Sequence, residues 1–318
     1  AMLPPVTRPL DDIDLPLDDR RAGKVRVSDS LADARRLFVT TDRLSAFDRI
    51  IALVPYKGQV LNQLSMWWFD QTRDIVANHA LSTPDPNVLI ARDAAPLTVE
   101  VIVRGYITGV TDTALWTQYA NGARTIYGHP FPDGLRKNTP LPEPIVTPTT
   151  KGEAGTHDVP LSSAEVVSGG FVDGALWAEV ESAALSLFRH GAQRGADAGL
   201  ILADTKFEFG VAATGELLLI DEALTPDSSR WWVAHSYAER IAGGSEPESL
   251  DKEVVRRALA DVGYTGDGPV PDLPAEVWLA TAERYVDAYE RLTGKMFVPG
   301  VYPAEPRILA AVARLETE

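Results

Sequence analysis

A short run of alternating charged and apolar residues at 204–209 most constrains what this 318-residue chain can fold into. The run reads DTKFEF, so Asp204, Lys206 and Glu208 occupy every second position. Successive side chains of a β-strand point to opposite faces, which puts the three charges on one face and Phe207 and Phe209 on the other. The pattern predicts a strand with its phenylalanines in the core and its three charges on the opposite face.

The residues after this strand predict that the chain turns back on itself. Residues 210–215 are turn-forming, and ELLLI at 216–220 predicts a returning strand, so the two runs form an antiparallel hairpin. Pairing across such a hairpin places Glu208 beside Ile220 or Asp221. Two carboxylates therefore converge, which is destabilising unless a cation or a proton lies between them.

Two interpretations of the hairpin stay open at this level. A hard divalent cation such as Mg²⁺, bound by the carboxylates together with phosphate oxygens, resolves the repulsion. The alternative is a solvated hairpin in which Lys206 is an ordinary cross-strand partner. The run TPDSSR at 225–230 favours the first, because it ends in two hydroxyls and a guanidinium that suit a phosphate or carboxylate. Its alternative is a turn in which Arg230 pairs with Asp227.

Composition limits the class of protein. The length suits about two domains, and no segment reaches the roughly 18 apolar residues of a membrane helix, so we expect a cytoplasmic protein without a membrane partner. The absence of cysteine excludes disulfides, thiolate catalysis and zinc-thiolate sites. The formal net charge of -15 argues against a nucleic-acid-binding surface. Any anionic ligand must therefore be held by specific Lys and Arg side chains.

Periodicity predicts the main elements outside the hairpin. Strands are predicted near 23–27, 36–41, 87–91 and 97–103, and amphipathic helices over 61–77, 175–195 and 274–293. Residues 123–162 are rich in Gly, Pro and Thr, which predicts a long irregular connection. Such a connection in a compact protein is usually functional or disordered, and its content favours a functional loop.

Two clusters near the N-terminus carry residues suited to binding chemistry. In RAGKVR at 21–26, Gly23 precedes Lys24 and Arg26, which lets backbone and charge approach a polyphosphate. The alternative is a solvated basic strand. TDRLSAFD at 41–48 gathers two acids, an arginine and a serine in a turn, or alternatively forms the cap of a helix.

Two further clusters lie in the middle of the chain. VIVRGY at 101–106 delivers Arg104 at the end of a buried strand, which suits a bidentate anion contact. TPTTKGEAGTHD at 147–158 offers hydroxyls, Lys151 and a His157–Asp158 pair. A lone histidine is more often structural than catalytic, and without a nucleophile this pair forms no triad.

In this order, the clusters resemble the motif series of the phosphoribosylaminoimidazole-succinocarboxamide synthase (SAICAR synthetase) family. The matching segments are GKVR at 23–26, TDRLSAFD at 41–48, KG at 57–58, VRGY at 103–106, TPTTK at 147–151, HD at 157–158, DTKFEFG at 204–210 and PDSSR at 226–230. The resemblance extends over about residues 20 to 300.

The resemblance implies an α+β, two-lobed fold related to ATP-grasp and kinase-like nucleotide binders, with mostly antiparallel sheets and flanking helices. A β-rich N-terminal lobe at 1–98 covers the ATP phosphates, and an α+β lobe at 99–318 holds the metal and substrate sites. The implied reaction uses ATP and Mg²⁺ to join L-aspartate to the carboxylate of carboxyaminoimidazole ribotide (CAIR) in purine biosynthesis. No protein nucleophile is needed, and the oligomeric state stays open.

The roles of individual residues are implied by the same resemblance. Gly23, Lys24 and Arg26 match the strand over the ATP phosphates, backbone groups around Glu100 match the adenine contacts, and Glu208 and Asp221 match the Mg²⁺-ATP carboxylates. Arg104, Ser229 and Arg230 match the cradle of the ribotide phosphate. Lys151, Asp158, Asp204 and Lys206 match the catalytic zone around the imidazole carboxylate, where Asp158 or Asp204 accepts a proton. Asp48 and the Lys151 loop are the candidates for binding aspartate.

The chain departs from the family pattern at three positions near the implied substrates. Val110 follows Gly109 where most members carry serine, Asp29 lies where an aromatic residue is common, and Val159 replaces an acid. The candidates to replace the missing serine are Thr108, Thr111 and Thr113. These departures keep one alternative open, a paralogue that ligates an amino acid to another heterocyclic carboxylate in nucleoside-type metabolism. A separate alternative, from another class, is a non-catalytic nucleotide-binding or scaffold protein that kept the fold.

Overall fold

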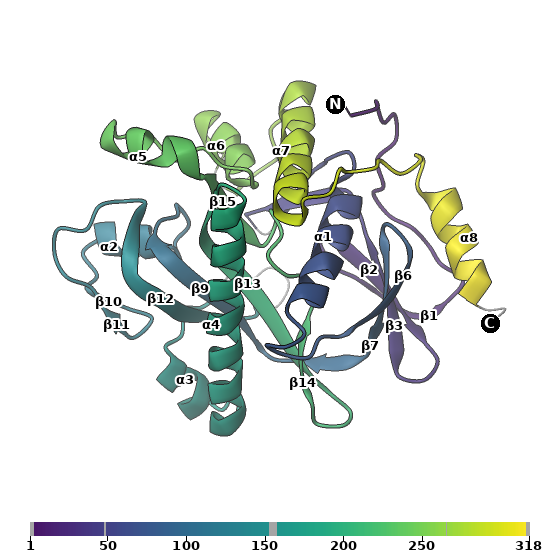
Figure 1. Cartoon of the computed structure of the whole chain (residues 1–318), viewed down its shortest axis with the longest axis horizontal. Helices are drawn as coiled ribbons and strands as arrows, with labels where there is room; N and C mark the ends of the chain where they lie inside the picture. The colour runs from purple at the N-terminus through teal and green to yellow at the C-terminus, as the bar shows by residue number, and fades with distance from the viewer. Residues whose placement is uncertain (1–2, 48, 153–157, 265, 316–318) are drawn as a thin grey trace.

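A five-stranded antiparallel sheet forms the N-terminal part of the molecule in this computed structural model, which describes residues 3–47, 49–152, 158–264 and 266–315 (Figure 1). Its order is β1-β2-β3-β7-β6. The strands are β1 (Asp18–Ala22), β2 (Arg26–Leu31), β3 (Arg35–Thr40), β6 (Ala80–Asp85) and β7 (Val88–Arg92). A small hairpin of β4 (Arg43–Ala46) and β5 (Arg49–Leu53) and helix α1 (Lys57–Gln71) separate β3 from β6.

A second antiparallel sheet follows, in the order β12-β9-β13-β14, with β8 and β15 also paired to β13. Its strands are β8 (Ala94–Pro96), β9 (Val99–Ile107), β12 (Thr139–Thr150), β13 (Leu200–Ala212), β14 (Leu217–Ile220) and β15 (Ser229–Val233). The long helix α4 (Gly174–Asp197) lies across this sheet (Figure 1) and contributes Leu187 and Phe188 to the main apolar core.

Strand β13 is the centre of the second sheet. Its first half pairs with β9 and β15, and its second half pairs with β8 and β14. Phe207 and Phe209 are 0% and 1% exposed in the core, and Glu208 is the register partner of Ile220. The predicted alternation and the predicted hairpin register are therefore both confirmed.

The remaining helices lie around the two sheets. They are α2 (Leu115–Ala120), α3 (Ser163–Ser168), α5 (Ala234–Ala242), α6 (Glu253–Asp261), α7 (Ala275–Thr293) and α8 (Glu305–Leu315). Helix α7 packs against α1. Within the part of the chain that the structure describes, no helix is long and apolar enough to cross a membrane.

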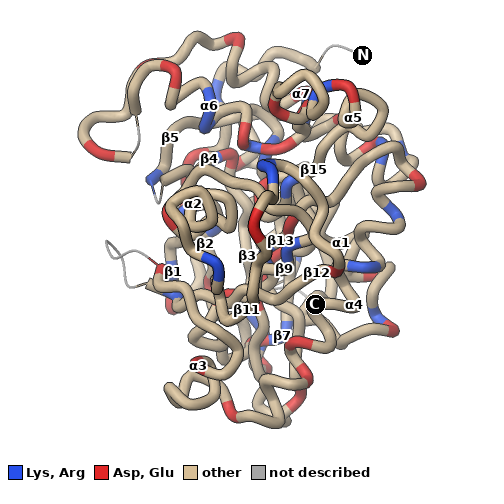
Figure 2. Tube along the Cα trace, turned by 90° about the vertical axis from the view of Figure 1, so that its left-hand side faces the viewer, with Lys and Arg blue, Asp and Glu red and all other residues tan. Residues whose placement is uncertain are grey.

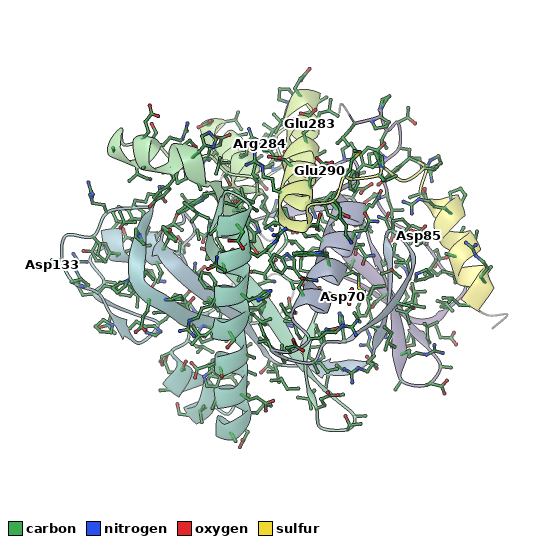
Figure 3. The ribbon with its side chains drawn as sticks, in the orientation of Figure 1. Asp70, Asp85, Asp133, Glu283, Arg284 and Glu290 are labelled. Carbon is green, nitrogen blue, oxygen red and sulfur yellow. The ribbon has the colours of Figure 1, made fainter. Side chains whose placement is uncertain are left out.

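The C-terminal helix α8 returns to the first sheet (Figure 1). Its Ile308 and Val312 share an apolar cluster with Val27 and Val39 of that sheet. Asp85 at the end of β6 lies beside α8 (Figure 3), where Arg307 forms an ion pair with it. Leu10, from the segment before β1, belongs to the same cluster, so residues from both terminal parts of the chain pack on the first sheet. The division into lobes at 1–98 and 99–318 stays a prediction.

The prediction of an irregular connection over 123–162 is wrong for much of its length. The segment contains the short strands β10 (Thr125–Ile126) and β11 (His129–Pro130), and then the 12-residue strand β12. Four prolines hid this strand from sequence analysis, because proline cannot donate to a ladder. Strand β12 lies at the edge of its sheet, where one side needs no donors, and its register shifts between Pro140 and Ile145.

The buried face of β13 generates a prediction about stability. Phe207→Ala should lower the free energy of unfolding by about 3–5 kcal/mol, because it leaves a cavity in a fully buried site. Chemical denaturation followed by circular dichroism measures this change. A loss below about 1 kcal/mol, as expected for an exposed site, would contradict the placement of Phe207 in the core.

Candidate active site

The charged face of β13 connects two cavities of about 230 Å³ each. Asp204 and Lys206 line the first cavity, and Glu208 lines the second. Acidic and basic positions lie close together where β13 meets β9 and β15 (Figure 2). One strand therefore supplies charged groups to both cavities at a spacing of two residues.

Two arginines flank Asp204 in the first cavity. The strand register places Arg104 of β9 on one side of Asp204 and Arg230 of β15 on the other. Arg230 Nη1 donates to Asp204 Oδ2 over 2.6 Å, and Arg104 Nη1 lies 3.5 Å from the same oxygen. Ser229 Oγ lies 2.8 Å from Thr205 Oγ1 in the same wall. The carboxylate thus holds two guanidinium groups at the cavity surface.

The first cavity carries more cationic than anionic side chains. Its cations are Arg104, Lys206, Arg230, Lys252 and Arg256, and its carboxylates are Asp204, Asp227 and Asp251. The cavity is therefore positively charged, although the chain as a whole has a formal net charge of -15. The arrangement suits a ligand with several negative charges, such as a phosphate ester that also carries a carboxylate.

Sequence analysis missed Lys252 and Arg256, which come from the start of α6. Lys252 Nζ lies 3.7 Å from Asp227 Oδ1. Burial lowers the pKa of Lys252 to about 8, although the Asp227 carboxylate opposes this shift. The signal was present in DKEVVRR at 251–257, because a spacing of four residues places both cations on one face of a helix.

Glu208 lies between two ammonium groups at the junction of the cavities. Lys206 Nζ donates to Glu208 Oε1 over 3.1 Å, and Lys151 Nζ donates to Oε2. Burial alone raises the pKa of Glu208, but the charges of Lys206 and Lys151 outweigh it and hold this pKa at about 2. Glu208 is therefore ionised at neutral pH.

The side chain of Glu100 contacts the row of charged side chains on β13, which consists of Asp204, Lys206 and Glu208 and which we call the charged row. Lys206 Nζ donates to Glu100 Oε1 over 2.8 Å, while the backbone of Glu100 pairs with Thr149 of β12. Sequence analysis had expected backbone contacts at this position, and the adenine contact stays a prediction. The strand register explains the side-chain contact, since β9 runs directly beside β13.

The loop after Lys151 is described only at its two ends. Asp158 Oδ1 accepts a hydrogen bond of 2.9 Å from Gly152 N, which closes the loop at its base. His157 and Asp48, the other candidates from sequence analysis, lie outside the described residues.

Asp221 lines the second cavity beside Glu208. Burial raises its pKa to about 6, the Glu208 and Glu222 charges add to this shift, and Arg26 opposes it. Arg26 Nη1 donates to Asp221 Oδ1 over 2.9 Å. The repulsion that the hairpin sequence predicted is therefore present, and nearby cationic side chains balance it.

The two carboxylates fit the chemistry of a Mg²⁺ site. Both offer hard oxygen ligands, and their mutual repulsion would be relieved by a divalent cation. Among the described residues no group of three or more acidic or histidine side chains is placed to hold a metal. Mg²⁺ is commonly held by one or two carboxylates that share it with substrate phosphates, which is the arrangement these residues fit.

The second cavity lies between the first sheet and the β13–β14 hairpin. Phe38 of β3 and Ile220 of β14 offer apolar surfaces, while Arg21, Arg36 and Arg92 offer positive charge. This combination suits a ligand with a flat ring and phosphates. Gly23 and Lys24 form the turn before β2, where Gly23 N donates to Arg26 O over 2.8 Å.

None of the three residues that depart from the family pattern lines either cavity. Asp29 is fully buried on the face of β2 opposite Ser28, and Ser28 rather than Asp29 lines the second cavity. Val110 and Val159 are 51% and 55% exposed. Thr111 lines the first cavity with Arg104 and Arg230, whereas the buried Thr108 donates to Asn138 Oδ1 over 2.6 Å. Thr111 is thus the threonine best placed to replace the missing serine.

Comparison with known proteins gives one consistent result. The SAICAR synthetase family model matches residues 20–271. A phosphoribosylaminoimidazole-succinocarboxamide synthase of Legionella pneumophila is 47% identical over 310 residues, covering 96% of this chain and 98% of the relative.

Solved structures agree with the sequence comparison. The SAICAR synthase of Saccharomyces cerevisiae in complex with SAICAR has a TM-score of 0.76 and 34% identity, over 92% of this chain and 99% of that one. A SAICAR synthetase in complex with ADP has a TM-score of 0.67 and 25% identity, over 88% of this chain and 100% of that one. The expected fold class is confirmed, and the chain belongs to the SAICAR synthetase family.

Proposed function

We propose that this chain is an ATP-dependent ligase that joins L-aspartate to the carboxylate of CAIR in purine biosynthesis, and that it acts in the cytoplasm. The observation that carries the proposal is the charged row of β13, which leads from a cationic cavity to a pair of carboxylates. A ligase of this kind must bring an anionic acid and the terminal phosphate of ATP together. Relatives named for this activity, and a family structure that contains SAICAR, support the same function.

The first cavity is the proposed site of the ribotide. Arg104 and Arg230 would bind its phosphate, because their guanidinium groups are held side by side by Asp204. Ser229 and Thr111 line the same cavity and can add hydroxyl donors. The imidazole carboxylate would then lie toward Lys206, two residues further along β13.

The second cavity is the proposed site of ATP. Glu208 and Asp221 would hold Mg²⁺, which supplies charge neutralisation at the phosphates when bound. Gly23, Lys24 and Arg26 lie in the turn and strand between Arg21 and Ser28, which line this cavity, and would contact the phosphates. Lys151 and Lys206 already pair with Glu208, so their charges lie where the transferring phosphoryl group would carry negative charge.

The chemistry needs two displacements and no protein nucleophile. A carboxylate oxygen of CAIR attacks the γ-phosphorus of ATP, and the bond from that phosphorus to ADP breaks. The amine of aspartate then attacks the acyl carbon, and phosphate leaves as the amide forms. The ammonium group of aspartate must lose one proton before it attacks and a second as the amide forms, and we propose Asp158 as the acceptor of the first. Asp204 is less suited, because it pairs with the charged guanidinium groups of Arg230 and Arg104, whereas Asp158 accepts from the neutral backbone amide of Gly152.

A different heterocyclic acid is the alternative substrate. The geometry gives it no specific support, since Asp29 points away from the second cavity and Thr111 lies at the first. Steady-state assays with CAIR and with other heterocyclic carboxylates decide between them. Phosphate release that depends on aspartate and CAIR is expected, and release only with another acid would contradict the proposal.

The proposed metal site generates a prediction about turnover. Glu208→Gln and Asp221→Asn should each lower kcat by at least about a hundredfold, because each removes a charged metal ligand. Both variants should remain folded: Asp221→Asn removes like-charge repulsion, and Glu208→Gln keeps the side-chain volume and an oxygen that can still accept from a neighbouring lysine. Coupled ADP-release assays measure the rate, and Glu179→Gln on the exposed face of α4 is the matched control. Normal turnover in either variant would show that the metal lies elsewhere.

The proposed phosphate cradle generates a second prediction. Arg230→Ala should raise the KM for CAIR by about tenfold or more, which corresponds to the loss of a charge-assisted contact of roughly 1.5–3 kcal/mol. The KM for MgATP should stay within about twofold of its original value. Arg189→Ala on α4, also exposed, controls for the loss of a positive charge. An unchanged KM for CAIR would remove Arg230 from the cradle.

A further inference from the structure

Lys57 is a fully buried lysine that the proposed chemistry does not use. It is the first residue of α1, its side chain is 0% exposed, and its Nζ lies 3.3 Å from Asp227 Oδ2. Lys57 is not among the described residues that line either cavity. A buried ion pair contributes little to stability compared with apolar residues of similar size, because both charges lose their hydration. Packing alone therefore does not explain this ammonium group.

Asp227 connects Lys57 to the wall of the first cavity. Both Asp227 and Lys252 line that cavity, and Lys252 Nζ lies 3.7 Å from Asp227 Oδ1. Tyr285 OH of α7 donates to the same oxygen over 3.0 Å. Asp227 therefore has Lys57 on one oxygen, and Tyr285 and Lys252 on the other.

This division of the two oxygens affects how Lys252 can behave. With Oδ2 taken by Lys57, and Oδ1 shared with Tyr285, the pairing of Lys252 with Asp227 stays loose at 3.7 Å. A loosely paired ammonium group at a cavity surface is available to a ligand anion. Without Lys57, the full charge of Asp227 would act on Lys252 and draw it away from the cavity.

The charges around Lys252 come from α6, from α1 and from the loop before β15. Asp227 and Glu222 attract the ammonium group from the loop before β15, Lys57 repels it from α1, and Arg256 repels it from α6. Asp251 and Glu253 are its neighbours in sequence, and Tyr285 faces it from α7 through Asp227. Burial lowers the pKa of Lys252 to about 8, and the charges of Arg256 and Lys57 act in the same direction.

We propose that Lys57 is a positioning residue, which acts through Asp227 to keep the Lys252 ammonium group in the first cavity and available to the anionic ribotide. This inference rests on the proposed function for the identity of the ligand. It assigns a role in substrate binding to a side chain of α1, which reaches the cavity only through Asp227.

The test measures binding of 5-aminoimidazole ribotide, which lacks the reactive carboxylate, by calorimetry between pH 6.5 and 9.5. In the original protein the affinity should fall as pH rises through about 8, because Lys252 loses its proton there. In Lys57→Met this fall should move up by about one pH unit, since a repelling charge is removed and Asp227 acts on Lys252 alone. The Kd at pH 7 should rise about tenfold, because the ammonium group is drawn toward Asp227.

Three variants make the result specific. Lys252→Met should abolish the fall in affinity near pH 8, which assigns it to Lys252. Tyr285→Phe also removes a partner of Asp227 but no charge, so its pH dependence should match the original protein. Lys57→Gln repeats the test with a polar side chain, and thermal unfolding checks the fold of each variant.

The outcomes separate this inference from the proposed function. An unshifted pH dependence in both Lys57 variants would overturn it, as would failure of both variants to fold, which would show a structural role. Binding of the ribotide by a protein that does not ligate CAIR to aspartate would overturn the proposed function alone. Absence of ribotide binding in the original protein would overturn this inference, and the proposed function would stand if CAIR is still ligated to aspartate.

Discussion

The central constraint on this molecule is the two-residue period of β13. One face of the strand buries Phe207 and Phe209, and the other presents Asp204, Lys206 and Glu208. Partly buried charges are tolerated only when paired, so each of the three has partners of opposite charge on neighbouring strands or loops. The site is therefore built from the same ladder that forms the core, and a shift in strand register would disrupt both together.

The two-residue spacing of the charges along β13 lets this one strand line both cavities. Asp204 holds two arginines for an anion, whereas Glu208 lies between two lysines close to Asp221. Lys206, between these carboxylates in sequence, pairs with Glu208 and with Glu100 of the next strand. Alternating charges keep the row close to electrical balance before any ligand binds. A divalent cation and a phosphate can then replace internal partners without leaving unpaired charges.

Sequence alone predicted the parts of the site that follow from local pattern. The strand alternation, the hairpin register and the convergence of Glu208 and Asp221 all depend on residues within one hairpin. Lys252, Arg256 and the side-chain role of Glu100 depend on how distant elements pack, and sequence analysis missed them. Strand β12 was missed because its prolines oppose strand formation except at an edge, and edge position is a tertiary property. The packing of α8 on the first sheet likewise joins the two ends of the chain.

The most direct test of the link between the two cavities is a crystal structure with Mg²⁺, a non-hydrolysable ATP analogue and CAIR. The ribotide phosphate should lie against Arg104 and Arg230, and the terminal phosphate of the nucleotide against Glu208 and Asp221 through Mg²⁺. The imidazole carboxylate should lie between them beside Lys206, at roughly 3–3.5 Å from the phosphorus that it attacks. A ribotide phosphate bound away from Arg104 and Arg230, or a metal bound away from Glu208 and Asp221, would contradict the assignment of the two cavities.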